Sequence, residues 1–226
     1  GHGNAVSDLA HQLRKAMHKS INTVDQSKLA RTLNKSFDTI SSGSQFATAL
    51  LMTYFAPSGH LIFVNAGHPP PLLKRANTTQ WIPLDQNTQG VLRIPTNDLK
   101  IGIKNLPLGV IHSTEYEQIA IKFEPGDLIC AYTDAYTEAQ SANGSLLGTD
   151  GLANLLNSIA HESTTQIPHL LLEELTNRGF SHADDDHTML MLHHNGTGTN
   201  KVGPATLANL IKNSFGFGHT DTVVAS

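Results

Sequence analysis

The chain has 226 residues, of which 39% are hydrophobic, enough to bury the core of one large domain. Its formal net charge is −4 and it has no run of Lys or Arg, so we expect no nucleic-acid partner. The longest apolar stretch, residues 49–56, is far shorter than the ~20 residues that cross a bilayer. Since no signal peptide is evident either, we expect a cytoplasmic protein without a membrane partner.

The first part of the chain predicts two helices and a hairpin. Apolar residues recur at steps of three and four over residues 6–17, and again over residues 29–40 after Asp25, a suitable N-cap. Two strand-like segments, residues 46–55 and 60–65, flank a short turn that contains Pro and Gly. We therefore expect two amphipathic helices followed by a β-hairpin.

The middle of the chain predicts a loop and a central strand. Residues 65–71 contain one glycine and three prolines, which end both helices and central strands, so they form a rigid loop. Within it, His68 is interpreted as a hydrogen-bonded structural residue, with contact to a phosphate as the alternative. The nearly continuous apolar run over residues 128–132 predicts a buried strand, in which Cys130 is a small core residue rather than a reactive thiol.

The last part of the chain predicts two more helices, over residues 152–159 and 167–175, and a strand over residues 188–193. From residue 196 the composition shifts to Gly, Thr and Asn, and we treat 196–226 as a tail with one short helix. Helices and antiparallel strands are thus grouped along the chain instead of alternating. This order favours an α+β fold with helices outside the sheets.

Carboxylates gather where two of the predicted strands end. Asp184, Asp185 and Asp186 directly precede the strand over residues 188–193, and Asp134 follows the strand over residues 128–132. Adjacent carboxylates repel one another, and a hard divalent cation bound by oxygen ligands relieves such repulsion. Taken alone, however, the triplet is equally compatible with a solvated acidic loop.

Five sequence blocks, in this order along residues 1–193, resemble the SpoIIE-like branch of bacterial metal-dependent PPM serine/threonine protein phosphatases. The opening Gly1 to Gly3 is similar to the end of a further motif of that family. The resemblance implies a four-layer αββα sandwich of two antiparallel sheets with helices outside. The blocks lie at residues 65–73, 106–110, 124–128, 132–139 and 185–188.

The resemblance also implies the site and its chemistry. Asp134 and Asp185 match the family's metal ligands and would be the catalytic residues, and Asp186 would belong to the same metal site as a support for bound water. Two Mn²⁺ or Mg²⁺ ions would activate a water for attack on phosphoserine or phosphothreonine. The implied partner is a phosphorylated protein, such as an anti-sigma-factor antagonist in sigma-factor regulation, and homodimer formation is left open.

Two departures from the family pattern leave an alternative open. The family's remaining metal ligands lie upstream of Gly1, so we expect a phosphatase domain over residues 1–195 that lacks its N-terminal strands. Ala135 also stands where the family usually has glycine. The alternative is a degenerate, non-catalytic module that binds a regulatory partner. A metallohydrolase acting on a small phosphoester is a third reading.

Overall fold

The computed structural model describes residues 4–20, 23–40, 45–94, 103–159, 164–181 and 186–197, without the side chains of residues 4–9 and 38–40. The chain forms two compact units. The first contains the described residues up to Gly67 and those between Leu92 and Lys122. The second contains residues 68–91 and 123–197. No described helix is long and apolar enough to pass through a membrane.

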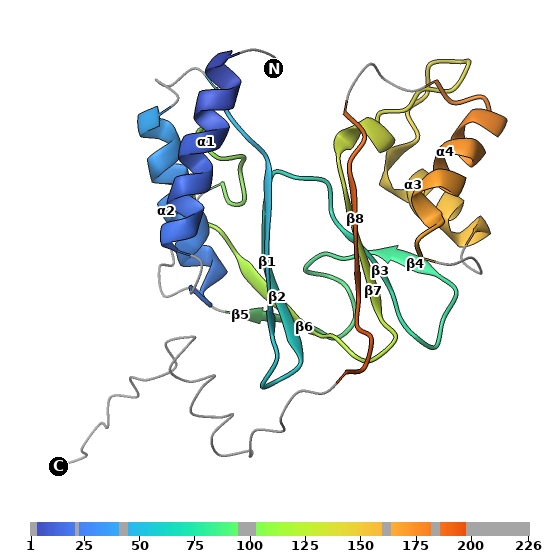
Figure 1. The fold of residues 1–226 in the computed structure, drawn as a ribbon, viewed down its shortest axis with the longest axis horizontal. Coiled ribbons are helices and arrows are strands. Elements are labelled where there is room, and N and C mark those ends of the chain that lie inside the picture. The colour runs from blue at the N-terminus through green and yellow to red at the C-terminus, as the bar shows by residue number, and fades with distance from the viewer. Residues whose placement is uncertain are drawn as a thin grey trace. The chain divides into compact units, whose positions relative to one another are not determined.

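The first unit carries two helices beside a four-stranded sheet of order β1-β2-β6-β5 (Figure 1). Its core forms where Leu33 and Phe37 of the second helix pack with Leu51 and Val64 of the sheet. Asp25 caps that helix as predicted, because its Oδ1 accepts a hydrogen bond from the Lys28 amide at 2.9 Å. The elements are α1 (Asn4–Lys19), α2 (Gln26–Ile40), β1 (Ala49–Phe55), β2 (His60–Ala66), β5 (Val91–Ile94) and β6 (Gln118–Lys122).

The second unit has the sheet order β4-β3-β7-β8, with antiparallel pairing throughout, and two further helices. One core holds Leu72 and Cys130 of the sheet together with Leu152, Leu156 and Leu171 of the helices. The strand β7 lies between β3 and β8, which confirms the predicted central strand. The elements are β3 (Leu72–Lys74), β4 (Trp81–Pro83), β7 (Leu128–Tyr132), the 3₁₀ helix η1 (Asp134–Tyr136), α3 (Gly148–Ser158), α4 (Ile167–Asn177) and β8 (Met189–His193).

The predicted α+β class is confirmed, since each unit supplies one antiparallel sheet and one helical pair of the kind an αββα sandwich requires. The interpretation of Cys130 is confirmed as well. Its side chain is fully buried in the second unit, and burial raises the pKa of the thiol to about 12. A thiol with so high a pKa forms almost no nucleophilic thiolate at neutral pH.

Gly67 and Pro107, one residue from each of two sequence blocks, meet in the first unit. Gly67, in the loop over residues 65–71, has φ +68°, and a Cβ placed on it would lie 2.6 Å from Cδ of Pro107. Only a residue without a side chain permits this approach. Gly67 and Pro107 are therefore packed directly against each other.

Gly109 of that same segment gives a stability prediction. Its amide donates to Oδ1 of the buried Asn34 at 2.8 Å, its φ is +87°, and an added Cβ would lie 2.6 Å from the Phe37 ring and 2.8 Å from the Gln45 carbonyl oxygen. Gly109→Ala is expected to lower the free energy of unfolding by about 2–4 kcal/mol, because left-handed strain and overpacking add. Urea unfolding followed by circular dichroism measures the loss.

The matched control for this substitution is Gly144→Ala. Gly144 has a similar φ of +82°, but no atom lies within 4 Å of the position of its added Cβ. Only the conformational cost remains, about 1 kcal/mol. Equal losses in the two variants would show that the contacts with Phe37 and Gln45 are not tightly packed.

Candidate functional site

The candidate site lies in the second unit, where β7 ends and β8 begins. Tyr132 pairs with Met189 in the antiparallel register, so the residues that follow β7 lie beside those that precede β8. Asp134 is the first residue of η1, and Asp186 lies three residues before β8. The structure thus places an exposed carboxylate side chain in each of two adjacent segments.

Thr133 joins these two segments. Its hydroxyl donates to the Asp186 carbonyl oxygen at 2.8 Å and accepts a hydrogen bond from the Thr188 amide at 3.0 Å. Its own amide donates to the Thr188 carbonyl oxygen at 3.0 Å. One short side chain therefore extends the β7–β8 pairing beyond the strands and fixes the backbone next to both carboxylates.

Asp134 is held by its backbone while its side chain remains exposed. The Asp134 carbonyl oxygen accepts hydrogen bonds from the Glu138 amide at 2.8 Å and from the Thr137 hydroxyl at 3.0 Å. Ala135 is buried, and Asn105 is the only non-glycine with a positive φ in the described part of the chain. Alanine at position 135 therefore fits the 3₁₀ turn without left-handed strain.

His68 connects the loop over residues 65–71, here called the proline-rich loop, to the end of β7. Its ring is half-buried and forms a hydrogen bond with the Tyr132 backbone, and the Tyr132 hydroxyl donates to the Pro70 carbonyl oxygen at 2.8 Å. Burial lowers the pKa of His68, and the hydrogen bond and the negative charge of Asp134 oppose this shift. A lowered pKa keeps the imidazole mainly neutral at pH 7, which suits a structural role.

His187 is the third residue of the block over residues 185–188, at a variable position of that motif. Its side chain is predicted to be exposed, and the structure shows otherwise. The ring is half-buried and packs edge-on against Tyr136, with the ring centroids 5.1 Å apart and an interplanar angle of 90°. This contact joins η1 to the segment before β8. Such a long-range packing contact leaves no signal in the local sequence pattern.

Asp185, a predicted metal ligand, lies outside the described residues. So do Asp184 of the acidic triplet and the opening segment Gly1 to Gly3. The convergence of Asp134 with Asp185 therefore stays a prediction. Among the residues that the structure does describe, no group of three or more His, Cys, Asp or Glu is arranged to hold a metal ion. The donors near Asp134 and Asp186 include carboxylate, hydroxyl and carbonyl oxygens, which suit Mg²⁺ or Mn²⁺, besides the imidazoles of His68 and His187.

The family model for stage II sporulation protein E (SpoIIE) matches residues 1–195. The chain belongs to the SpoIIE family. A relative of the chain is protein IcfG of Synechocystis sp., which is 23% identical over 157 residues. That match covers 67% of this chain but only 21% of IcfG, so this SpoIIE-family chain spans a small part of its relative.

Two solved structures show the same fold. The RsbU and RsbW domains of Rv1364c from Mycobacterium tuberculosis match with a TM-score of 0.65 and 23% identity, over 96% of this chain and 58% of that one. The PP2C phosphatase domain of SpoIIE from Bacillus subtilis, with a fragment of its regulatory domain, matches with a TM-score of 0.57 and 18% identity, over 84% and 51%. This SpoIIE-family chain therefore has the fold of PP2C-type phosphatase domains.

Proposed function

We propose that the chain is the catalytic part of a metal-dependent phosphoprotein phosphatase that hydrolyses phosphoserine or phosphothreonine. The observation that carries this proposal is the set of Thr133 hydrogen bonds, which fixes the backbone beside Asp134 and Asp186 at adjacent strand ends. Family membership supports the same reaction class. Fold alone does not establish an activity, so the proposal depends on these residues.

Each residue has a defined role in this proposal. Asp134 and Asp185 would hold two Mn²⁺ or Mg²⁺ ions, and Asp186 would support bound water. When bound, such ions supply an acidified water and neutralise charge on the phosphoryl oxygens. Thr133 keeps the two carboxylate-bearing segments together. His68 is a neutral anchor between the proline-rich loop and the end of β7.

The substrate we propose is a phosphorylated regulatory protein in bacterial signalling, such as an anti-sigma-factor antagonist. The relative from M. tuberculosis joins an RsbU domain to an RsbW domain, which supports a regulatory protein as partner. We further propose a cytoplasmic location, a catalytic domain over residues 1–195 and a tail over residues 196–226.

The test is a phosphate-release assay on the natural protein that contains this chain. Phosphoserine and phosphothreonine peptides are incubated with Mn²⁺, with Mg²⁺ and with EDTA. We expect release with at least one of the two metals and none with EDTA. If neither metal supports phosphate release and calorimetry detects no ion binding, the non-catalytic module is favoured. The observation that supports this alternative is the buried methyl group of Ala135 beside Asp134.

A further inference from the structure

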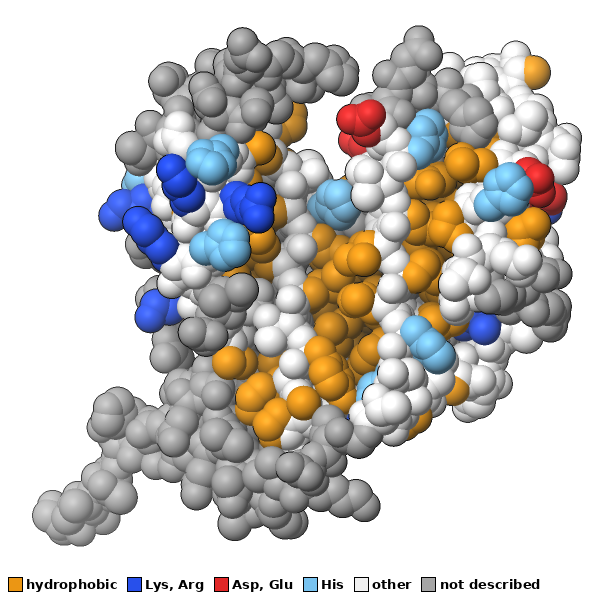
Figure 2. Space-filling view, viewed as in Figure 1, with side chains coloured by type: hydrophobic (Ala, Val, Ile, Leu, Met, Phe, Trp, Pro, Cys, Tyr) orange, Lys and Arg blue, Asp and Glu red, His pale blue; other side chains and the backbone are white. Residues whose placement is uncertain are grey.

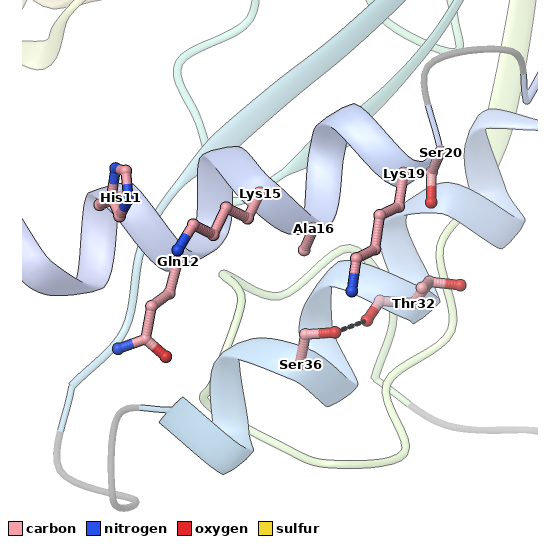
Figure 3. A pocket seen from close by; sticks show the side chains of 8 residues that line it. All are labelled: His11, Gln12, Lys15, Ala16, Lys19, Ser20, Thr32 and Ser36. Atoms are coloured by element: carbon pink, nitrogen blue, oxygen red, sulfur yellow. Dashed lines mark hydrogen bonds between the residues drawn. The ribbon is translucent and has the colours of Figure 1, made fainter.

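A groove between α1 and α2 of the first unit has no role in the proposed reaction. Its volume is about 620 Å³, and Figure 3 shows the Lys19 side chain extending from α1 toward Thr32 and Ser36 of α2. Among the side chains that the structure describes there, the lining contains amines, an imidazole, hydroxyls and one amide, and no carboxylate. The residues that line the groove are His11, Gln12, Lys15, Ala16, Lys19, Ser20, Thr32 and Ser36.

The groove lies in the basic part of an acidic chain. Six of the fifteen Lys and Arg residues are in α1 and α2, against two of the nineteen Asp and Glu residues. These helices therefore carry +4 in a chain whose net charge is −4, which leaves −8 for the remainder. Figure 2 shows Lys and Arg side chains gathered on this part of the first unit. The charge is segregated, so local attraction to an anionic partner is strong despite the overall negative charge.

The basic side chains of the groove form a row. His11, Lys15 and Lys19 recur every four residues, which places them along one face of α1 over about 12 Å. Within the described part of the chain, neither Lys15 nor Lys19 forms an ion pair, whereas Arg31 of α2 pairs with Glu115 at 3.3 Å. No described carboxylate therefore competes with a partner for these two lysines.

The opposite wall of the groove adds hydrogen-bonding groups with the same spacing. The Thr32 hydroxyl donates to the Lys28 carbonyl oxygen at 2.9 Å, and the Ser36 hydroxyl donates to the Thr32 carbonyl oxygen at 2.9 Å. Such bonds lie within one helix, where each carbonyl oxygen already accepts from a backbone amide. The hydroxyls can therefore turn toward a carboxylate in the groove without leaving a buried group unpaired.

We propose that the groove between α1 and α2 is a docking site for an acidic segment of a partner protein, with carboxylates repeated at intervals of about four residues. The 12 Å row matches several carboxylates along one segment better than it matches a single phosphate. A concave groove admits a narrow peptide but not a flat bilayer. The charge of −8 on the rest of the chain opposes a long polyanion such as nucleic acid. This site is independent of phosphate hydrolysis.

Fluorescence anisotropy tests the proposal with the full chain and a labelled alanine-based peptide that has Glu at every fourth position. We expect binding that weakens as salt is raised, and no binding of the same peptide with Gln in place of Glu. Lys15→Gln/Lys19→Gln is expected to weaken binding about fivefold or more, since two exposed charge pairs are lost. Circular dichroism checks that the variant is folded.

The control removes two positive charges outside the groove, in Lys28→Gln/Lys104→Gln, and is expected to leave binding within about twofold. Equal weakening in both double variants would overturn the proposal, because it would show attraction to net charge alone. Equal binding of the Glu and Gln peptides would also overturn it. Tighter binding of a single-stranded DNA of the same charge would overturn the proposal and assign the groove to nucleic acid. Self-association that Lys15→Gln/Lys19→Gln abolishes, with no binding of the peptide, would overturn it as well and assign the groove to a second copy of the chain.

Discussion

Asp134→Asn is expected to lower metal-stimulated phosphate release by about 100-fold or more. The amide keeps the shape of the side chain but removes the negative charge that binds a divalent cation. Because the Asp134 side chain is exposed and its structural hydrogen bonds involve only its carbonyl oxygen, the free energy of unfolding should change by less than about 0.5 kcal/mol. Steady-state kinetics on a phosphopeptide and calorimetric metal titration measure the two effects.

Glu138→Gln is the matched control for Asp134→Asn. Glu138 lies four residues after Asp134, and its side-chain carboxylate is exposed. Its backbone amide donates to the Asp134 carbonyl oxygen. The same change from carboxylate to amide should leave both activity and metal affinity within about twofold, since the side chain is not assigned to the metal site. If Asp134→Asn kept full activity while metal binding was retained, Asp134 would not be a ligand and the proposed reaction would lose its main residue.

Asp127→Ala is expected to lower the free energy of unfolding by about 3 kcal/mol or more. Asp127 is 1% exposed, and its carboxylate accepts hydrogen bonds from Arg75 Nη1 at 2.7 Å, the Ala76 amide at 3.0 Å and the Glu124 amide at 3.0 Å. Alanine leaves two backbone donors and one guanidinium without their acceptor. Guanidinium chloride unfolding at neutral pH measures the loss.

Glu173→Ala is the control for Asp127→Ala. Its carboxylate is 54% exposed and lies 3.2 Å from His169 in the same helix, an arrangement that contributes at most ~0.5 kcal/mol. Similar losses in the two variants would show that the hydrogen bonds of Asp127 do not stabilise the second unit. Asp127 immediately precedes β7, and the end of β7 leads to Asp134. The hydrogen bonds of the Asp127 carboxylate therefore stabilise the strand that positions the candidate site.

Local patterns in the sequence were sufficient to predict most of the regular elements. The helical periodicity over residues 6–17 and 29–40 predicted α1 and α2, and the apolar run over residues 128–132 predicted β7 with its bounds. These signals are strong because each element buries one face or both faces, so its apolar residues follow the period of the backbone. The strand β5 (Val91–Ile94) was missed, because a short edge strand with exposed residues carries no such period.

The bounds predicted for the remaining elements were less accurate where turns and isolated bridges replace regular pairing. The first strand of the hairpin begins at Ala49 instead of residue 46, because Phe46 is exposed and Ala47 pairs only through a bridge to Leu108. α3 begins at Gly148, ahead of the first periodic residue, Leu152. The polar first turn of this helix carries no apolar signal.

The sequence by itself determined the fold class, the central strand, the family resemblance and the acidic residues that follow or precede strands. Only the tertiary structure decided which of these segments meet: Thr133 bonds to Asp186 and Thr188, His68 to the Tyr132 backbone, and α1 packs beside α2 to form a basic groove. The physical reason is sequence separation. Thr133 and Asp186 are 53 residues apart, and a contact over that distance depends on strand order and register, which no local period specifies.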